Sequence, residues 1–162
     1  MPEFVLEMKN IDKSFFKVKV LDKVSFNLIP GEVHALVGEN GAGKSTLMKI
    51  LMGIYHRDAG EILLDGKPVT FQTPREALDN GIAMIPQELS PILDIGAAEY
   101  IFIGREIRKN NLGGLSIVDK KAQIQETDKL FKSAGIEINS KCLMRNLSVA
   151  QIQLVEIIKA IS

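Results

Sequence analysis

The chain has 162 residues, with 20 basic and 20 acidic side chains, so its formal net charge is zero. A chain of this length can bury one hydrophobic core without disulfides or bound metal. Zero net charge provides no global field that would attract a nucleic-acid backbone, which disfavours a polynucleotide partner. The single cysteine, Cys142, excludes an internal disulfide, and no cluster of Cys or His surrounds it to indicate a zinc site.

The first third of the chain alternates apolar and polar residues with the period of half-buried strands. Strands are predicted at 4–8 and 24–29, and a short apolar run at 33–37 predicts another strand that leads directly into a glycine-rich loop. Apolar side chains at helical spacing predict a helix over 44–54. The glycine-rich loop therefore stands between a predicted strand and a predicted helix.

The middle of the chain continues to alternate strands and helices. A strand is predicted at 60–64 because the turn pair Asp65-Gly66 follows it. A short helix is predicted at 74–80, and the compact apolar run at 82–85 suits a buried strand. This alternation predicts an α/β fold.

The second half of the chain is predicted to be mainly helical. A helical stretch covers 97–106, and the polar stretch 108–114 predicts an exposed loop. Asp119 is a plausible N-cap of an amphipathic helix that ends near 134–135, and Ser148 can cap the last helix.

Residues 38–46 read GENGAGKST and match the P-loop pattern. Its glycines let successive backbone N–H groups face oxygen anions, and the following helix directs its positive N-terminal dipole at the same point. Lys44 supplies a charge to the outer phosphates, Ser45 offers a hydroxyl to Mg²⁺, and Thr46 is placed to contact an inner phosphate. The predicted phosphate-binding residues are Gly38, Asn40, Gly41, Ala42, Gly43, Lys44, Ser45 and Thr46.

Three further segments accompany the P-loop. Phe15 precedes it, Gln87 ends the run IAMIPQ, and the last helix begins with LSVAQ. Taken singly, Phe15 fits a core residue, Gln87 a solvated loop and LSVAQ a serine-capped helix start. In this order the four segments resemble the A-loop, P-loop, Q-loop and signature motif of the ATP-binding cassette (ABC) family.

The resemblance implies a role for each of these residues. Phe15 would stack on adenine. Gln87 would reach Mg²⁺ and the attacking water, so that Lys44 and Gln87 serve catalysis while Ser45 and Gln87 serve the metal. Ser148 and Gln151 would contact the nucleotide on an opposing cassette.

The segments PREALDNGIAMIPQEL and VEIIKA are most similar in sequence to the ATPase subunits of bacterial monosaccharide importers of the ribose, galactose and xylose type. The resemblance implies a P-loop NTPase fold, with an antiparallel β subdomain and P-loop core at 1–96 and a mainly helical subdomain at 97–162. Implied ligands are ATP and Mg²⁺. Implied partners are transmembrane permease subunits, a second cassette and, indirectly, a periplasmic or extracellular sugar-binding protein. The protein would be peripheral on the cytoplasmic face of the membrane, and no nucleic-acid partner is implied.

Two features depart from the family pattern. The only apolar strand ending in Asp is ILLD at 62–65, but Gly66 follows it where the catalytic Glu of the Walker B strand is expected, and the sequence stops at Ser162, where that strand would begin. Val149 and Ala150 take the two glycine positions of the signature. We expect a truncated domain that binds ATP weakly, hydrolyses it negligibly and pairs with other chains through unpaired sheet edges.

Two alternative functions lack their expected features. A P-loop kinase of small molecules needs clustered arginines, and a soluble ABC-type ATPase of DNA repair or translation needs basic patches. Neither is visible in this sequence. The resemblance also implies that the stretch 97–106 helps to form a groove for the coupling helix of the permease. Ile101 and Phe102 would then be exposed docking residues, although core packing explains them equally well.

Overall fold

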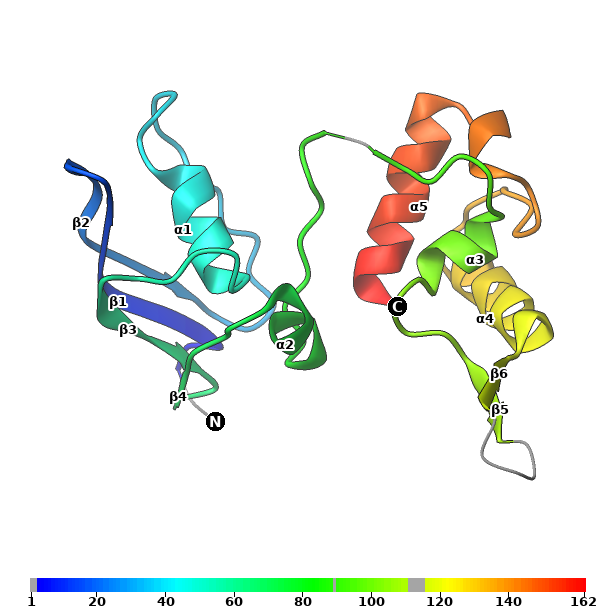
Figure 1. The fold of residues 1–162 in the computed structure, drawn as a ribbon, viewed down its shortest axis with the longest axis horizontal. Coiled ribbons are helices and arrows are strands. Elements are labelled where there is room, and N and C mark those ends of the chain that lie inside the picture. Colours follow the sequence, from blue (N-terminus) through cyan, green and yellow to red (C-terminus); the bar gives the residue numbers. More distant parts are fainter. Residues whose placement is uncertain (1–2, 89, 111–115) are drawn as a thin grey trace. The chain divides into compact units, whose positions relative to one another are not determined.

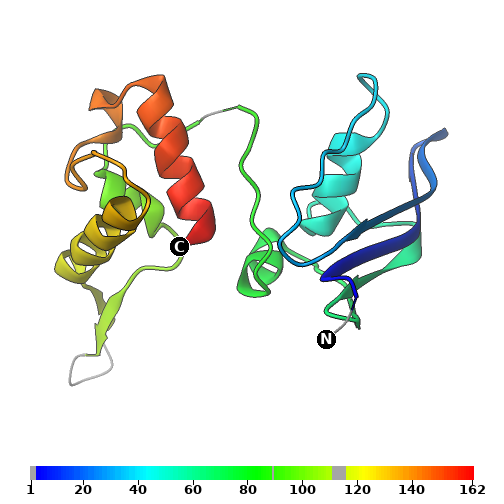
Figure 2. The ribbon, with the colours of Figure 1, turned by 180° about the vertical axis from the view of Figure 1, so that it is seen from behind.

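The computed structural model describes residues 3–88, 90–110 and 116–162. These residues form two compact units, one within Met1–Ala83 and the other within Met84–Ser162 (Figures 1 and 2). Each unit has its own hydrophobic core. Among the described residues, no helix combines the length and the apolar character that crossing a membrane requires.

The first unit contains a four-stranded antiparallel sheet with the strand order β2-β1-β3-β4. The central strand β1 (Leu6–Phe15) pairs with both β2 (Val18–Leu28) and β3 (Ala59–Leu64), and the short β4 (Lys67–Val69) lies at the edge. β1 and β2 are longer than the strands predicted at 4–8 and 24–29, because both continue to the turn of the hairpin that joins them. The register of β1 shifts at several bulges, which increase the local twist of the sheet.

Two helices complete the first unit. α1 (Lys44–Leu51) packs its apolar face against the sheet, and α2 (Pro74–Asp79) begins after Thr73, whose hydroxyl accepts a hydrogen bond from the backbone N–H of Glu76 at 3.2 Å (Figure 1). Thr73 is therefore the N-cap, and Pro74 fits the first turn because that position needs no N–H donor. The core between sheet and helix consists of Leu6, Met8, Ile11, Leu21, Leu47, Ile50, Leu51 and Ile62.

The predicted strands at 33–37 and 82–85 are wrong, because neither segment belongs to a strand in the structure. Val33 is 99% exposed and Ile85 is 46% exposed. Apolar runs of this kind form strands only when a neighbouring strand accepts their backbone hydrogen bonds. No such partner occurs among the strands of the described residues. The expected pairing between chains through unpaired sheet edges stays a prediction.

The second unit is mainly helical, and its three helices surround a second core. The largest of them, α4, is capped by Asp119 as predicted, because the carboxylate accepts a hydrogen bond from the N–H of Ala122 at 3.1 Å. The elements are α3 (Ala97–Ile101), β5 (Arg108–Asn110), β6 (Ser116–Val118), α4 (Lys120–Ser133), a 3-10 turn (Met144–Asn146) and α5 (Val149–Ile161).

Two predictions for the second unit are corrected. Ile101 is fully buried and Phe102 is 8% exposed, and both belong to the core, so they are not exposed docking residues. The predicted loop at 108–114 is partly wrong, because β5 pairs with β6 as a short antiparallel ribbon. Residues 111–115 of that segment lie outside the described residues.

A buried polar contact joins α3 to α5 inside the second core. The phenol of Tyr100 donates a hydrogen bond to the carboxylate of Glu156 at 2.5 Å, and both residues are buried. The ammonium of Lys159 lies 4.1 Å from the centre of the Tyr100 ring, a cation–π contact. Burial, followed by the Glu156 carboxylate, raises the pKa of Tyr100 well above its ordinary value.

Candidate functional site

The first turn of α1 presents a group of backbone donors. Its N-cap is Gly43, which has no side chain to accept a hydrogen bond, and the backbone N–H groups of Gly43, Lys44, Ser45 and Thr46 bond to no other described residue. These N–H groups point out of the helix start, where the helix dipole also favours negative charge. The arrangement suits an oxyanion.

Gly43 lies in tight contact with β2. Its φ of 85° is in the left-handed region, and a Cβ atom built there would come within 2.6 Å of Cδ2 of Leu21 and 3.0 Å of the carbonyl oxygen of Val20. Glycine is therefore required at this position for two reasons, its backbone conformation and its close approach to the strand. This contact fixes the start of α1 against the sheet.

The side chain of Lys44 folds back over the loop that precedes α1. Its ammonium donates to the carbonyl oxygens of Gly38 at 2.5 Å and Glu39 at 2.8 Å. The N–H of Ala42 also bonds to the oxygen of Glu39, at 3.2 Å, which closes the loop as a turn. The positive charge is thus held at the loop beside the free N–H groups.

The remaining predicted residues of the P-loop are accessible. Gly38, Asn40, Gly41, Ala42 and Ser45 are exposed. Gly41 has a φ of 87°, and no atom lies within 4 Å of the place where its Cβ would be, so this glycine serves the turn alone. Thr46 is half-buried, and neither its hydroxyl nor that of Ser45 bonds to another described residue.

Phe15 ends β1 in the same unit as the P-loop. Its ring meets that of Tyr55 edge-on, with centroids 5.1 Å apart and an interplanar angle of 73°. The ammonium of Lys13 lies 5.4 Å from the centre of the ring. Phe15 is half-buried, whereas its neighbour Phe16 is fully exposed.

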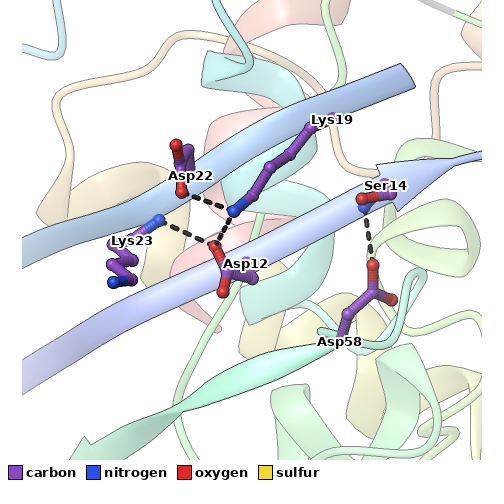
Figure 3. A network of polar contacts seen from close by, with 6 residues as sticks. All are labelled: Asp12, Ser14, Lys19, Asp22, Lys23 and Asp58. Atoms are coloured by element: carbon purple, nitrogen blue, oxygen red, sulfur yellow. Dashed lines mark hydrogen bonds and ion pairs between the residues drawn. The ribbon is translucent and has the colours of Figure 1, made fainter. Parts of the chain in front are cut away.

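A polar network fixes the hairpin that carries Phe15 (Figure 3). The carboxylate of Asp12 accepts a hydrogen bond from the N–H of Lys23 at 2.8 Å and contacts the ammonium of Lys19 at 3.1 Å. Lys23 has a φ of 49° and lies where the pairing of β1 and β2 shifts register. These hydrogen bonds, that of Lys23 first, lower the pKa of Asp12 below its ordinary value. Asp12 therefore caps the bulge as an anion.

Asp58 ties the same hairpin to the start of β3. Its carboxylate accepts hydrogen bonds from the N–H of Ser14 at 2.6 Å and from the ammonium of Lys13 at 2.8 Å (Figure 3 shows the former). The Lys13 ammonium, followed by the Ser14 N–H, lowers the pKa of Asp58. The two aspartates hold the end of β1, and with it Phe15, in place.

Ser148 and Gln151 form a reciprocal pair at the start of α5, in the second unit. The Ser148 hydroxyl accepts from the N–H of Gln151 at 3.3 Å, and the Gln151 side chain accepts from the N–H of Ser148 at 2.9 Å. This is a capping box, so the predicted helix start is confirmed. Val149 and Ala150 follow in the first turn and are exposed.

The structure brings together only part of the predicted site. The P-loop and Phe15 belong to the first unit, whereas Gln87, which is exposed, belongs to the second with Ser148 and Gln151. Sequence reasoning missed Leu21 and Asp58. A leucine against a glycine and an aspartate before a strand carry no local signal, and only the tertiary contacts identify them.

Comparisons with known proteins place this geometry in context. Residues 21–162 match the protein family described as ABC transporter. The chain is 51% identical over 159 residues to the putative ribose/galactose/methyl galactoside import ATP-binding protein of Halalkalibacterium halodurans, covering 98% of the chain and 30% of that protein. It is 47% identical over 158 residues to the galactose/methyl galactoside import ATP-binding protein of Clostridium perfringens, again covering 98% of the chain and 30% of that protein. The chain therefore spans about 30% of the length of these relatives.

The fold of the chain is similar to solved structures of ATP-binding cassettes. A crystal structure of the ADP conformation of an ATP-binding cassette from an ABC transporter matches with a TM-score of 0.81 and 26% identity, over 97% of the chain and 64% of that structure. A nucleotide-free ATP-binding cassette matches with a TM-score of 0.80 and 26% identity, over the same shares of both chains.

Proposed function

Because the chain belongs to the ABC transporter family, we propose that residues 38–46 bind the phosphates of ATP and that the whole protein uses this ATP to drive the import of a monosaccharide. The observation that carries the proposal is the start of α1, where the free N–H groups of Gly43, Lys44, Ser45 and Thr46 lie beside the Lys44 ammonium. A negatively charged phosphate chain matches these donors.

The residues of the loop would have different roles in binding the phosphates and Mg²⁺, according to their charge and position. The N–H groups of the first turn would surround the phosphates, and the Lys44 ammonium would turn from the carbonyl oxygens of Gly38 and Glu39 toward the outer phosphates. The hydroxyl of Ser45 fits Mg²⁺, because it is an exposed oxygen with no hydrogen-bond partner among the described residues. Mg²⁺ would neutralise charge on the phosphate oxygens.

For the residues outside the P-loop we propose the roles that the family resemblance implies. Phe15 would stack on adenine through its ring. Gln87 would reach Mg²⁺ and the attacking water. Ser148 and Gln151 would meet the nucleotide of a second cassette, with their capping box fixing the start of α5 for that contact.

The import function rests on the named relatives, which are import ATP-binding proteins for ribose, galactose or methyl galactoside. By this proposal, permease subunits carry the sugar, a sugar-binding protein delivers it, and the ATPase lies on the cytoplasmic face of the membrane. The 162 residues contain no Asp-Glu pair that could supply the catalytic carboxylate. We therefore expect this chain to bind ATP and to hydrolyse it negligibly.

Calorimetric titration of the 162-residue chain with MgATP tests the phosphate site. We expect Lys44→Ala to weaken binding by roughly 10- to 100-fold, the range for hydrogen bonds to a charged group. Lys67→Ala, which removes an exposed lysine on β4, is the matched control and should bind like the unmodified chain. Equal affinities for all three proteins would refute the P-loop assignment, and steady hydrolysis abolished by Lys44→Ala would refute the expected inactivity.

A further inference from the structure

A small hollow lies in the second unit, and none of its lining residues belongs to the proposed nucleotide site. It is formed where the start of α3, the first turns of α4 and the turn at 140–141 meet, and its volume is about 190 Å³. Two backbone hydrogen bonds fix its walls, from Ala97 to the oxygen of Cys142 and from Ala98 to the oxygen of Ser140, both at 2.9 Å. The hollow therefore has a defined shape.

Two buried polar side chains line this hollow without a partner. Gln123 is 2% exposed and Ser140 is 3% exposed. Neither the Gln123 amide nor the Ser140 hydroxyl bonds to another residue in the described part of the chain. The polar atoms of both side chains remain accessible from the hollow, because Thr127 Oγ1 is the one fully enclosed side-chain polar atom without a partner among the described residues. The Gln123 amide and the Ser140 hydroxyl can therefore form hydrogen bonds with whatever occupies the hollow.

The rim of the hollow carries more positive than negative charge. Lys120 and Lys141 line it together with Glu99, whose carboxylate lies 3.5 Å from the ammonium of Lys120. Lys141 forms no ion pair with any described residue. One ammonium is thus left to attract an anion, and the amide of Gln123 and the hydroxyl of Ser140 can both donate to it.

We propose that this hollow binds a compact oxyanion, inorganic phosphate or the phosphate group of a small metabolite. Its volume lies below the roughly 300 Å³ at which sites for drug-sized ligands begin, so a nucleotide is too large. The Lys141 ammonium supplies the charge, and Gln123 and Ser140 supply directed hydrogen bonds at the base. The site is independent of the P-loop and would let the second unit respond to an anion other than ATP.

Titration of the ¹⁵N-labelled 162-residue chain with inorganic phosphate, followed by NMR, tests this proposal. Lys44→Ala is introduced in every sample, so that phosphate binding at residues 38–46 is suppressed. We expect saturable shifts at the amides of Gly96, Ala98 and Lys141, and none with the same concentration of chloride. A second arm with glycerol 3-phosphate distinguishes a small phosphorylated metabolite from free phosphate by which of the two saturates first.

Two variants locate the binding. Gln123→Leu keeps the size of the side chain and removes its donors, and Lys141→Ala removes the free charge. Each should weaken phosphate binding about tenfold or more. Lys132→Ala, which removes an exposed lysine from the last turn of α4, should leave binding unchanged. Circular dichroism checks that each variant is folded, and Ser140→Ala replaces Gln123→Leu if that variant unfolds.

Three results would overturn the proposal: shifts that rise linearly without saturation, equal shifts with chloride, or an equal loss in the Lys132 variant. In each case the hollow is not a specific site for a phosphate group. The ATP titration of the chain with Lys44 intact is a separate measurement. Failure at the hollow therefore leaves the nucleotide site unaffected, and failure at the P-loop leaves the hollow unaffected.

Discussion

Gly43 and Leu21 meet so closely that a Cβ atom on the glycine would lie 2.6 Å from Cδ2 of the leucine. Leu21 is 2% exposed and belongs to the core of the first unit, so it cannot move aside without disturbing that core. Packing against β2 therefore fixes the start of α1. The same packing sets the position of the free N–H groups of the P-loop.

Gly43→Ala should lower the stability of the first unit by about 2–4 kcal/mol. Roughly 1–2 kcal/mol come from placing alanine at a φ of 85°, and the rest from overlap with Leu21 and with the Val20 carbonyl oxygen. Urea unfolding followed by circular dichroism measures the change. Binding of MgATP should weaken as well, because the helix start must shift.

Gly81→Ala separates the two contributions. Gly81 has nearly the same φ, 83°, but no atom lies within 4 Å of its Cβ position. It should therefore show only the conformational part, about 1–2 kcal/mol, and leave ATP binding intact. Equal losses in the two variants would contradict the role assigned to Leu21.

Asp58 provides a prediction for acid conditions. Because Lys13 and Ser14 lower its pKa in the folded state, its contribution to stability is present above the ordinary carboxyl value near 4 and is lost as the pH falls through the lowered value. Asp58→Asn should therefore unfold at a lower temperature than the unmodified chain at pH 7. The difference should shrink as the pH falls below the ordinary carboxyl value and disappear once the pH is below the lowered pKa of Asp58, where its side chain is neutral.

Asp22→Asn is the matched control for Asp58→Asn. Asp22 lies in the same polar network (Figure 3), but among the described residues its one ion-pair partner is the exposed Lys19 ammonium. Exposed ion pairs of this type contribute about 0–1 kcal/mol. A larger effect at Asp22 than at Asp58 would show that the backbone N–H of Ser14 does not matter for the hairpin.

The sequence predicted those parts of the molecule whose signals are local. The P-loop, the Asp119 cap and the Ser148 cap each depend on residues within one or two helical turns, and all three helix starts form where they were expected. Such signals need no information about distant parts of the chain. For this reason the helix starts are the most accurate part of the prediction.

The parts that could not be predicted depend on distant partners. An apolar run such as 33–37 predicts a strand, but whether it becomes one depends on a neighbour that these described residues do not provide. The bulge at Asn10 is equally non-local, because Gly60 on β3 must approach it so closely that a Cβ would lie 2.4 Å from the Asn10 carbonyl oxygen. The hollow beside Gln123 also arises from elements far apart in sequence.

The Tyr100–Glu156 contact predicts a loss of stability in the second unit. Tyr100→Phe leaves the buried Glu156 carboxylate without the donor that lies 2.5 Å from it, so unfolding should require about 1.5–3 kcal/mol less at pH 7. Glu156→Gln is the control, because its side-chain oxygen can still accept from the phenol, and its loss should be smaller. If Tyr100→Phe is as stable as the unmodified chain, the hydrogen bond from Tyr100 to Glu156 does not stabilise the second unit.

The same contact predicts an alkaline limit. Burial and Glu156 raise the pKa of Tyr100 in the folded state, so the stability that the neutral phenol contributes is complete below the ordinary value near 10 and is lost as the pH rises above it. The stability difference between the unmodified chain and Tyr100→Phe should therefore narrow from about pH 10 upward. Urea unfolding at pH 7, 9 and 11 measures this trend, and a constant difference would exclude it.

Ser148 is predicted to have a structural role that is separate from any contact with a nucleotide. Ser148→Ala removes the acceptor for the N–H of Gln151 and should destabilise α5 by about 1 kcal/mol. Ser148→Asp restores an acceptor at the N-cap and should lie within a few tenths of a kcal/mol of the unmodified chain. Amide hydrogen exchange in the first turns of α5 measures both variants. If Ser148→Asp exchanges as fast as Ser148→Ala, the hydroxyl does not stabilise the helix by capping, and the capping box contributes no stability to α5.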